Sequence, residues 1–322
     1  MKAFLINKVG SPNNLELKTV DDPKPQTGEV LIRHTAIGIN YFDVCFRNGA
    51  YKLSQTPAIL GLEACGIIEE VGKGVTDYKV GERVAYATGP IGSYCERRAV
   101  KQNYLVIPPQ GLTDEQVAGS LLKGMMAHAL LFRVYLAARV KRILVHGAAG
   151  GVGHFLCQWA SHLGIEVIGT VGSDSKVAIA KSFGCSHVIN YTSKDFLAEL
   201  DAITKGEGVG IVYDGVGKDT ILKSIDCLWP MGMCVSYGEA SGANPPIDLN
   251  ALLLNSLYIT RPTLALYKAK RIELVLSANE VLNAVATGIL KPNITTYQFS
   301  DIPKAHLDLE SRKTVGTLVA KV

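Results

Sequence analysis

Charged residues are sparse in this sequence, and no run of basic residues occurs in it. Asp, Glu, Lys and Arg make up 19% of the 322 residues and 48% are hydrophobic, so the chain can bury a sizeable core. The formal net charge is only +4, and the Lys and Arg residues are scattered along the chain. Without a basic run, the composition argues against nucleic-acid binding and favours an ordinary soluble surface.

Cysteine pairs at metal-binding or redox spacing are also missing. The number of cysteines is odd and no C-x-x-C occurs. The seven cysteines are Cys45, Cys65, Cys95, Cys157, Cys185, Cys227 and Cys234. Their wide spacing predicts free, mostly buried thiols in a reducing cytoplasm and argues against a disulfide framework.

Signals for export and for membrane insertion are absent as well. The first fourteen residues contain no apolar signal-peptide core and no small-residue cleavage site. The longest stretch without Asp, Glu, Lys or Arg, residues 143–165, contains five glycines and three histidines, so it is a poor membrane span. We therefore expect a cytoplasmic protein with no membrane partner.

The hydrophobic pattern predicts two domains of different texture, in keeping with a length that exceeds one typical domain. Residues 1 to about 110 contain short apolar or alternating runs between Gly, Pro and Asn turns, as expected for a small all-β barrel. A helix is predicted from about Asp114 to Leu136, with Thr113 as its N-cap.

From Arg142 onward, strand and helix patterns alternate. A strand and glycine loop, "RILVHGAAGGVG", precede a helix, "HFLCQWASHLG", and a second strand, "EVIGTVG". Further strands are predicted in "HVINY", "VGIVYDGVG", "GMCVSYG" and "SLYITRP". This spacing predicts a parallel sheet with helices on both faces. The remaining tail is expected to form one or two helices and a last strand, and to return to the first domain.

A glycine loop stands between the first of these strands and its helix. Ala148, Gly150 and Gly153 have the spacing A-x-G-x-x-G, a variant of the dinucleotide fingerprint. Small residues permit a tight turn and bring backbone N–H groups close to a pyrophosphate at the helix N-terminus. In this strand–loop–helix context the loop predicts dinucleotide binding.

The end of the second strand indicates which dinucleotide is bound. An NAD-dependent enzyme usually carries Asp or Glu there, whereas this strand ends in Val171. Lys176 follows closely and could bind the 2′-phosphate of NADPH, although it could also be a solvated helix residue. Asp174 is counter-evidence, because its carboxylate could fold back toward the site.

Several motifs together resemble one family. They are "GINYFD", "GLEACGIIEEVG", "VGERVAY", "LLKGMMAH", "VHGAAGGVG", "GTVGSDSK", "VYDGVG", "YITRP" and "LESR". Over essentially its whole length the chain resembles the zinc-independent, ζ-crystallin-like quinone oxidoreductases of the medium-chain dehydrogenase/reductase superfamily. The resemblance implies an α/β fold in which a GroES-like β-barrel catalytic domain (1–118) precedes a Rossmann doubly wound parallel-sheet domain (119–262), with residues 263–322 returning to the first. It also implies NADPH as cofactor, a quinone or related electrophile as substrate, and a homodimer.

Glu63 stands where zinc-dependent relatives hold their metal. Those relatives place a Cys in the loop corresponding to Asn40–Asp43 and a His at the position of Leu62, and they carry a four-cysteine lobe that is missing here. We therefore expect no metal. Glu63 is predicted to be a structural carboxylate bonded to nearby backbone or to Arg47, and Cys65 to lie in a buried strand.

The resemblance assigns two groups of site residues. Those expected to act on the acceptor are Asn40, Asp43, Cys45 and Tyr51. Those expected to bind NADPH are Tyr41, Lys123, Gly150, Gly151, Val152, Gly153, Gly172, Ser173, Lys176, Tyr191, Gly215, Val216, Tyr237, Gly238, Thr260, Arg261 and Arg312.

Two positions near the expected nicotinamide pocket depart from bacterial relatives, which often have Tyr in place of Cys45 and Thr in place of Met126. The cleft should therefore be less polar, unless Cys45 instead points into the barrel core. The expected reaction is hydride transfer from NADPH to a quinone, with Asn40 or Tyr51 donating a hydrogen bond to the developing oxyanion. The sequence leaves two alternatives. One is an NADPH-dependent enone or enoyl double-bond reductase, and the other is an NADPH- or RNA-binding protein with little turnover.

Overall fold

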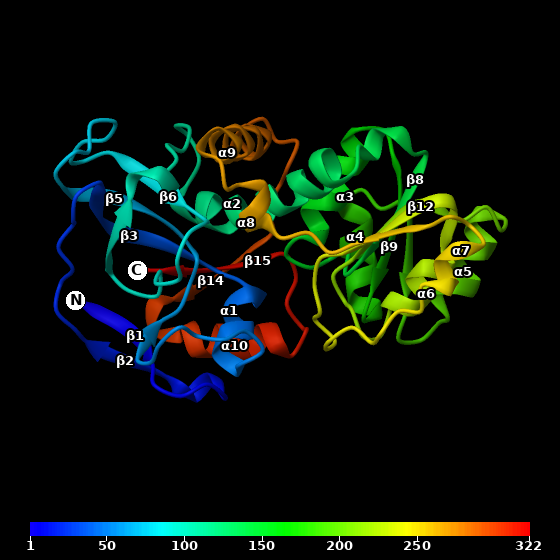
Figure 1. The fold of residues 1–322 in the computed structure, drawn as a ribbon, viewed down its shortest axis with the longest axis horizontal. Helices are drawn as coiled ribbons and strands as arrows, with labels where there is room; N and C mark the ends of the chain where they lie inside the picture. Colours follow the sequence, from blue (N-terminus) through cyan, green and yellow to red (C-terminus); the bar gives the residue numbers. More distant parts are fainter. The chain divides into compact units, whose positions relative to one another are not determined.

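A computed structural model describes residues 1–322, and the chain in it forms two units (Figure 1). Unit 1 contains residues 1–125, 268–288 and 292–322, and unit 2 contains residues 126–267 and 289–291. The boundaries after residues 125 and 267 lie a few residues later than the domain ends expected from the sequence, 118 and 262.

Two β-sheets build unit 1. The smaller has the order β2 (Leu15–Thr19), β1 (Lys2–Ile6), β4 (Ala58–Ile59). The larger has the order β14 (Ile294–Gln298), β15 (Thr317–Lys321), β3 (Glu29–Ile39), β5 (Glu63–Val71), β6 (Arg83–Tyr86), with β7 (Arg97–Lys101) also on β3. Apolar residues of both sheets, among them Phe4, Ile37 and Ile68, form one core cluster. The predicted all-β texture of this region is confirmed.

A short helix, α1 (Tyr41–Asn48), interrupts these strands and was not predicted from the sequence. Asn40 precedes it in an extended conformation, and the Asp43 side chain accepts a hydrogen bond of 2.9 Å from the Asn40 backbone N–H. Gly49 ends the helix with a φ of 88°, a left-handed value that glycine adopts without strain. The Asn-to-Asp spacing and the glycine are the local signals that could have identified this helix.

The predicted helix after the barrel is confirmed as α2 (Asp114–Ala129), which continues as a π-helical turn over Leu130–Val134. Thr113 caps it reciprocally with Gln116, as each side chain accepts from the other residue's backbone N–H. By length and composition alone the stretch 114–134 could cross a membrane, but 72% of its apolar 18-residue window is buried inside the protein.

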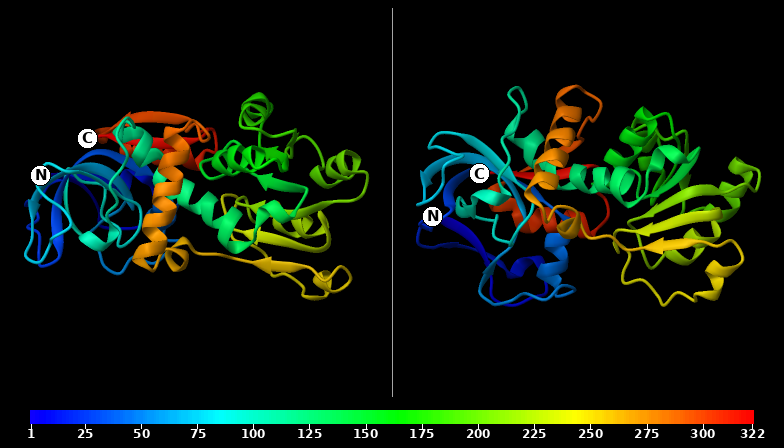
Figure 2. Two further views of the ribbon diagram at one scale, coloured as in Figure 1. Left: turned by 90° about the horizontal axis from the view of Figure 1, so that it is seen from above. Right: turned by 45° about the horizontal axis from the view of Figure 1, so that its top comes forward.

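Unit 2 contains the predicted parallel sheet, flanked by helices (Figures 1 and 2). Its order is β10 (His187–Asn190), β9 (Glu166–Val171), β8 (Arg142–His146), β11 (Val209–Asp214), β12 (Leu228–Ser236), β13 (Tyr258–Thr260). Its helices are α3 (Gly153–His162), α4 (Val177–Ser182), α5 (Phe196–Thr204), α6 (Ile221–Asp226), α7 (Asn250–Leu253) and α8 (Leu264–Tyr267). The strand order reverses between β8 and β11, and ligands of such sheets bind outside the carboxyl ends of the strands at this reversal.

The end of the chain belongs to unit 1, where it forms α9 (Arg271–Ala286), β14, α10 (Ile302–Glu310) and β15. Strand β15 runs antiparallel to β3, with Val319 opposite Gly38, and parallel to β14. The last strand thus completes the larger sheet beside the segment that leads into α1.

Candidate cofactor and acceptor site

The glycine loop follows β8 at the reversal of strand order in unit 2. Gly147 has a φ of +68°, which favours glycine, and α3 begins at Gly153. A Cβ on Gly153 would lie 2.1 Å from the Gly147 carbonyl oxygen, and one on Gly150 would lie 3.1 Å from it. A larger side chain at Gly153 would therefore clash with the backbone, while Gly150 and Gly151 are partly exposed, as expected of a loop that binds an anionic group through its backbone.

The loops after β11 and β12 lie against one another at the same end of the sheet. A Cβ on Gly215 would lie 2.6 Å from the Tyr237 ring, and one on Gly238 would lie 2.8 Å from the Gly215 carbonyl oxygen. The Tyr237 hydroxyl donates to the carbonyl of His146, the last residue of β8, at 3.5 Å. The structure therefore brings together these predicted positions beside the glycine loop.

A buried polar network that the sequence did not predict holds this edge in place. One oxygen of Asp214 accepts hydrogen bonds of 2.9 Å from the backbone N–H groups of Val216 and Gly217. Thr220 and Ser224 donate their hydroxyls to the same carboxylate. A carboxylate at a strand end followed by G-V-G was the available signal, because it can satisfy the N–H groups of the turn that follows.

The end of β9 has the features expected for a 2′-phosphate site. Asp174, the counter-evidence in the sequence, accepts a hydrogen bond of 2.8 Å from the Asn190 side chain. Lys176 lies in a 3-10 turn (Asp174–Lys176) before α4, is only partly exposed, and has a pKa lowered by burial. A Cβ on Gly172 would lie 3.3 Å from the Tyr191 hydroxyl, so this tyrosine covers the turn.

The remaining predicted cofactor residues lie apart in sequence. Thr260 ends β13, and Arg261 forms an ion pair of 2.6 Å with Glu239. Arg312 belongs to unit 1, where it follows α10 with an exposed side chain and a φ of 55°. Met126, one of the two departures from the family, is buried.

In unit 1, α1 carries two of the four residues predicted to act on the acceptor, Asp43 and Cys45, while Asn40 precedes the helix and Tyr51 follows it. Cys45 is half-buried, whereas the six other cysteines are buried, so it is not part of the barrel core. Tyr51 packs against Phe42 and Phe46, with ring centroids 5.0 and 5.7 Å away, and is therefore not an isolated surface aromatic. Tyr41 is half-buried, and burial raises its pKa.

Asp43 lies on the opposite, buried side of α1. Its carboxylate accepts from the Tyr94 hydroxyl at 2.9 Å, and that hydroxyl lies 2.9 Å from Nε2 of His306. Burial raises the pKa of Asp43 to about 7 and lowers that of His306 to about 3, so the imidazole is neutral at physiological pH. This environment makes Asp43 an internal support of α1.

Glu63 is fully buried at the start of β5, and its partners differ in part from the predicted ones. The predicted backbone bond is present, since Leu122 N–H donates to Oε1 at 2.6 Å. Arg47, the other predicted partner, instead pairs with Glu310. The cation beside Glu63 is Lys123, whose Nζ lies 3.7 Å from Oε2. Cys65 lies in the buried strand β5, as predicted.

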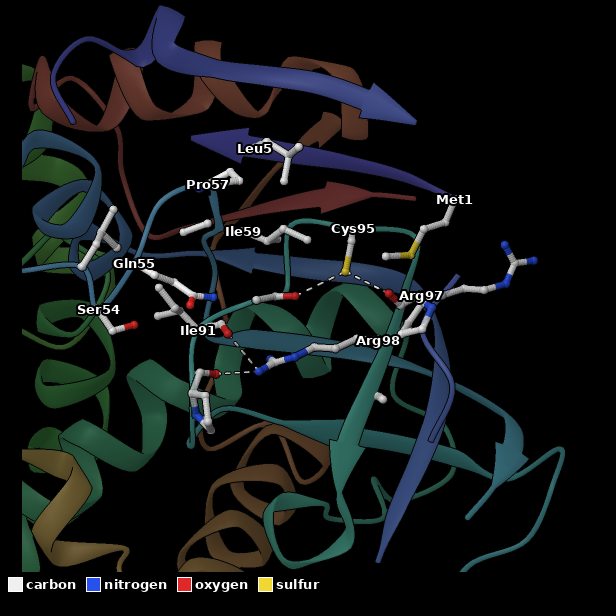
Figure 3. A pocket seen from close by; sticks show the side chains of 16 residues that line it. Met1, Leu5, Ser54, Gln55, Pro57, Ile59, Ile91, Cys95, Arg97 and Arg98 are labelled. Carbon is white, nitrogen blue, oxygen red and sulfur yellow. Dashed lines mark hydrogen bonds between the residues drawn. The ribbon is translucent and has the colours of Figure 1, made fainter. Parts of the chain in front are cut away.

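A pocket of about 530 Å³ opens elsewhere in unit 1 (Figure 3). Leu5, Ile59 and Ile91 give it apolar walls, and Arg98 donates to the carbonyls of Pro90 and Ile91 at its rim. None of the predicted site residues lines it. This pocket is therefore separate from the candidate site.

These features define a class of protein: a dinucleotide-dependent oxidoreductase with a GroES-like unit and a Rossmann unit. Residues 26–142 match the alcohol dehydrogenase GroES-like domain, and residues 151–277 match the zinc-binding dehydrogenase family.

Whole-chain relatives narrow this class. A 2-haloacrylate reductase of a Burkholderia species is 40% identical over 98% of both chains. Quinone oxidoreductase 1 of Escherichia coli strain K12 is 39% identical over 97% of this chain and 96% of its own. The crystal structure of an Escherichia coli quinone oxidoreductase complexed with NADPH has a TM-score of 0.96 at 38% identity, with complete coverage of both chains. The chain belongs to the medium-chain dehydrogenase/reductase superfamily, among its quinone oxidoreductase-like members.

Proposed function

We propose that this protein reduces quinones by hydride transfer from NADPH, without a metal ion. The carboxyl edge of the sheet in unit 2 carries this proposal, because its loops are built from closely packed glycines and its second strand ends at Val171 with Lys176 nearby. The match to quinone oxidoreductases over the full chain supports the acceptor. NADPH supplies the hydride when it is bound.

The residues present fit this cofactor. The glycine loop offers backbone N–H groups to the pyrophosphate, and Lys176 offers a cation to the 2′-phosphate. Asp174 does not oppose that phosphate directly, because its carboxylate is bonded to Asn190. In unit 1, Tyr51 offers a hydroxyl and Cys45 a half-buried thiol toward the acceptor. A quinone accepts hydride into a delocalised anion, so no strong general acid is required.

The absence of a metal requirement is supported by the surroundings of Glu63. A zinc ion in proteins is held by three or four Cys, His or carboxylate ligands. Here the residue before Glu63 is Leu62, and its carboxylate is hydrogen-bonded to the Asn40 side chain and ion-paired with Lys123. An amide and an ammonium group satisfy this carboxylate in place of a metal.

Reduction of an activated carbon–carbon double bond is the second candidate, because the Burkholderia relative is named a 2-haloacrylate reductase. The same hydride would then go to a β-carbon. An acceptor screen, with NADPH oxidation followed optically, separates the two. Turnover is expected with small quinones, and turnover with 2-haloacrylates, enones or enoyl thioesters but not with quinones would reverse the assignment.

The cellular state follows the same reasoning. We propose a cytoplasmic homodimer joined through unit 2. Seven free cysteines support a reducing compartment. Strand β13 is an edge strand, and nearby Leu253, Leu254 and Tyr258 are 72%, 94% and 56% exposed, a large apolar surface for a monomer. Light scattering on the purified protein should give twice the mass of one chain.

A further inference from the structure

Three ionisable side chains are buried together in unit 1, next to Asn40. Asp43 and Glu63 are completely buried, and the Lys123 side chain is 7% exposed. Burial raises the pKa of Glu63, while Lys123 and the hydrogen bonds from Leu122 and Asn40 oppose this rise. A buried charge is costly unless it is paired. A compact group of three buried ionisable side chains therefore calls for a structural or functional explanation.

The arrangement determines which way the Asn40 amide faces. Its Nδ2 lies 3.1 Å from Oε2 of Glu63 and 3.4 Å from the Gly38 carbonyl oxygen, so its two N–H donors are both directed into unit 1. The reversed amide would place Oδ1 against the carboxylate, and two acceptors repel. With Glu63 ionised, Asn40 therefore has no donor left and can offer a ligand only its carbonyl oxygen Oδ1, a buried acceptor that has no hydrogen-bond partner in the structure.

Two neighbours hold the Glu63 carboxylate in this role. Lys123 supplies the positive charge, and the Leu122 N–H fixes the other carboxylate oxygen. Gly38 leaves the necessary room, because a Cβ there would lie 2.3 Å from Oε2 of Glu63. The contacts come from β3, β5 and α2, all within unit 1.

We propose that the Glu63–Lys123 pair positions Asn40 as a hydrogen-bond acceptor for a hydroxyl or amide N–H group of the bound cofactor. The inference rests on the proposed function, because it requires the cofactor to lie beside Asn40. It makes Lys123 a positioning residue that acts through Glu63. It also leaves Tyr51, and not Asn40, as the hydrogen-bond donor to the developing oxyanion of the acceptor.

The double variant Glu63→Gln, Lys123→Met tests this pair without leaving a buried charge unpaired. The Leu122 N–H should retain the amide oxygen of the new glutamine, which turns its NH₂ group toward Asn40. Asn40 should then reverse and present donors to a cofactor group that is itself a donor. Replacement of Lys123 at the same time removes an ammonium that would face this NH₂ group.

The measurement is the dissociation constant of NADPH, obtained by fluorescence titration, with thermal melting as a check that each variant folds. The same double change is also made in an Asn40→Ser background, because Ser is a good N-cap for α1 and has no amide to orient. In the native background, the double change should weaken NADPH binding about tenfold. In the Ser background it should weaken binding less than about twofold, because the effects of residues that act through one another are not additive.

Equal weakening in both backgrounds would overturn the inference, because Lys123 or Glu63 would then act on the cofactor without Asn40. Unchanged binding in the native background would overturn it too, since the amide orientation would not matter. The proposed acceptor fails separately: a chain that binds NADPH with the expected non-additivity but reduces no quinone refutes quinone reduction and supports the positioning role.

Discussion

Replacement of Lys176 by Ala should weaken NADPH binding and leave NADH binding nearly unchanged. The two cofactors differ only in the 2′-phosphate, and Lys176 lies in the turn directly after β9. Burial lowers the pKa of this lysine, which means that its charged form is disfavoured by its surroundings. A phosphate dianion beside it would reverse that effect and stabilise the ammonium.

The size of the effect follows from the contact that is lost. Hydrogen bonds to charged groups contribute about 1.5–3 kcal/mol, and about 1.4 kcal/mol is a factor of ten in affinity. The side chain remains partly exposed, so solvent screening favours the lower half of this range. We expect the Michaelis constant for NADPH to rise roughly ten- to thirtyfold.

The assay compares both cofactors with one quinone acceptor. Lys181, an exposed lysine on α4, is the matched control, and its replacement by Ala should change neither Michaelis constant. If Lys176→Ala weakens NADPH and NADH equally, then the lysine supports the fold of the turn and does not contact the 2′-phosphate. An effect of Lys181→Ala as large as that of Lys176→Ala would point to long-range electrostatics.

Three further predictions concern neighbouring parts of the site. Asn190→Ala should release the Asp174 carboxylate, which would repel the 2′-phosphate and shift the ratio of kcat/KM values toward NADH; an unchanged ratio would mean that this hydrogen bond does not control cofactor choice. Cys45→Tyr should narrow the acceptor range toward small quinones at unchanged NADPH affinity, whereas a lowered melting temperature with an unchanged acceptor profile would make Cys45 structural. Elemental analysis should find far less than one zinc per chain, and activity should survive a chelator; stoichiometric zinc lost together with activity would contradict our interpretation of Glu63.

Local patterns were sufficient to predict unit 2. The central strands β8, β9 and β11 are short, largely apolar runs, and parallel strands buried on both faces need such runs. The cofactor could be predicted from the glycine loop and Val171, because each is a local feature of the sequence. The loop would bind through its own backbone, and Val171 marks the end of a single strand. The Asp174–Asn190 hydrogen bond could not be predicted, since it joins the ends of two strands whose spacing the sequence does not specify.

The helix α1 shows a different limit. Tyr41–Asn48 is only eight residues long, so it offers about two turns of periodicity, and its buried face includes the charged residues Asp43 and Arg47. Such a face does not produce an apolar stripe. What stabilises it lies far away in sequence, in Tyr94, His306 and Glu310.

Glu63 shows how far a single-sequence argument about charge can reach. A buried carboxylate must be compensated, so the sequence could predict a hydrogen bond or a cation beside it, but it could not choose between Arg47 and Lys123. The structure places Lys123 there, 3.7 Å from Oε2. A divalent metal at this carboxylate would have to displace the ammonium or leave two cations in contact in a buried site. The residue that completes the neutralisation of Glu63 therefore also opposes metal binding, which is the physical reason to expect a chelator to leave the enzyme active.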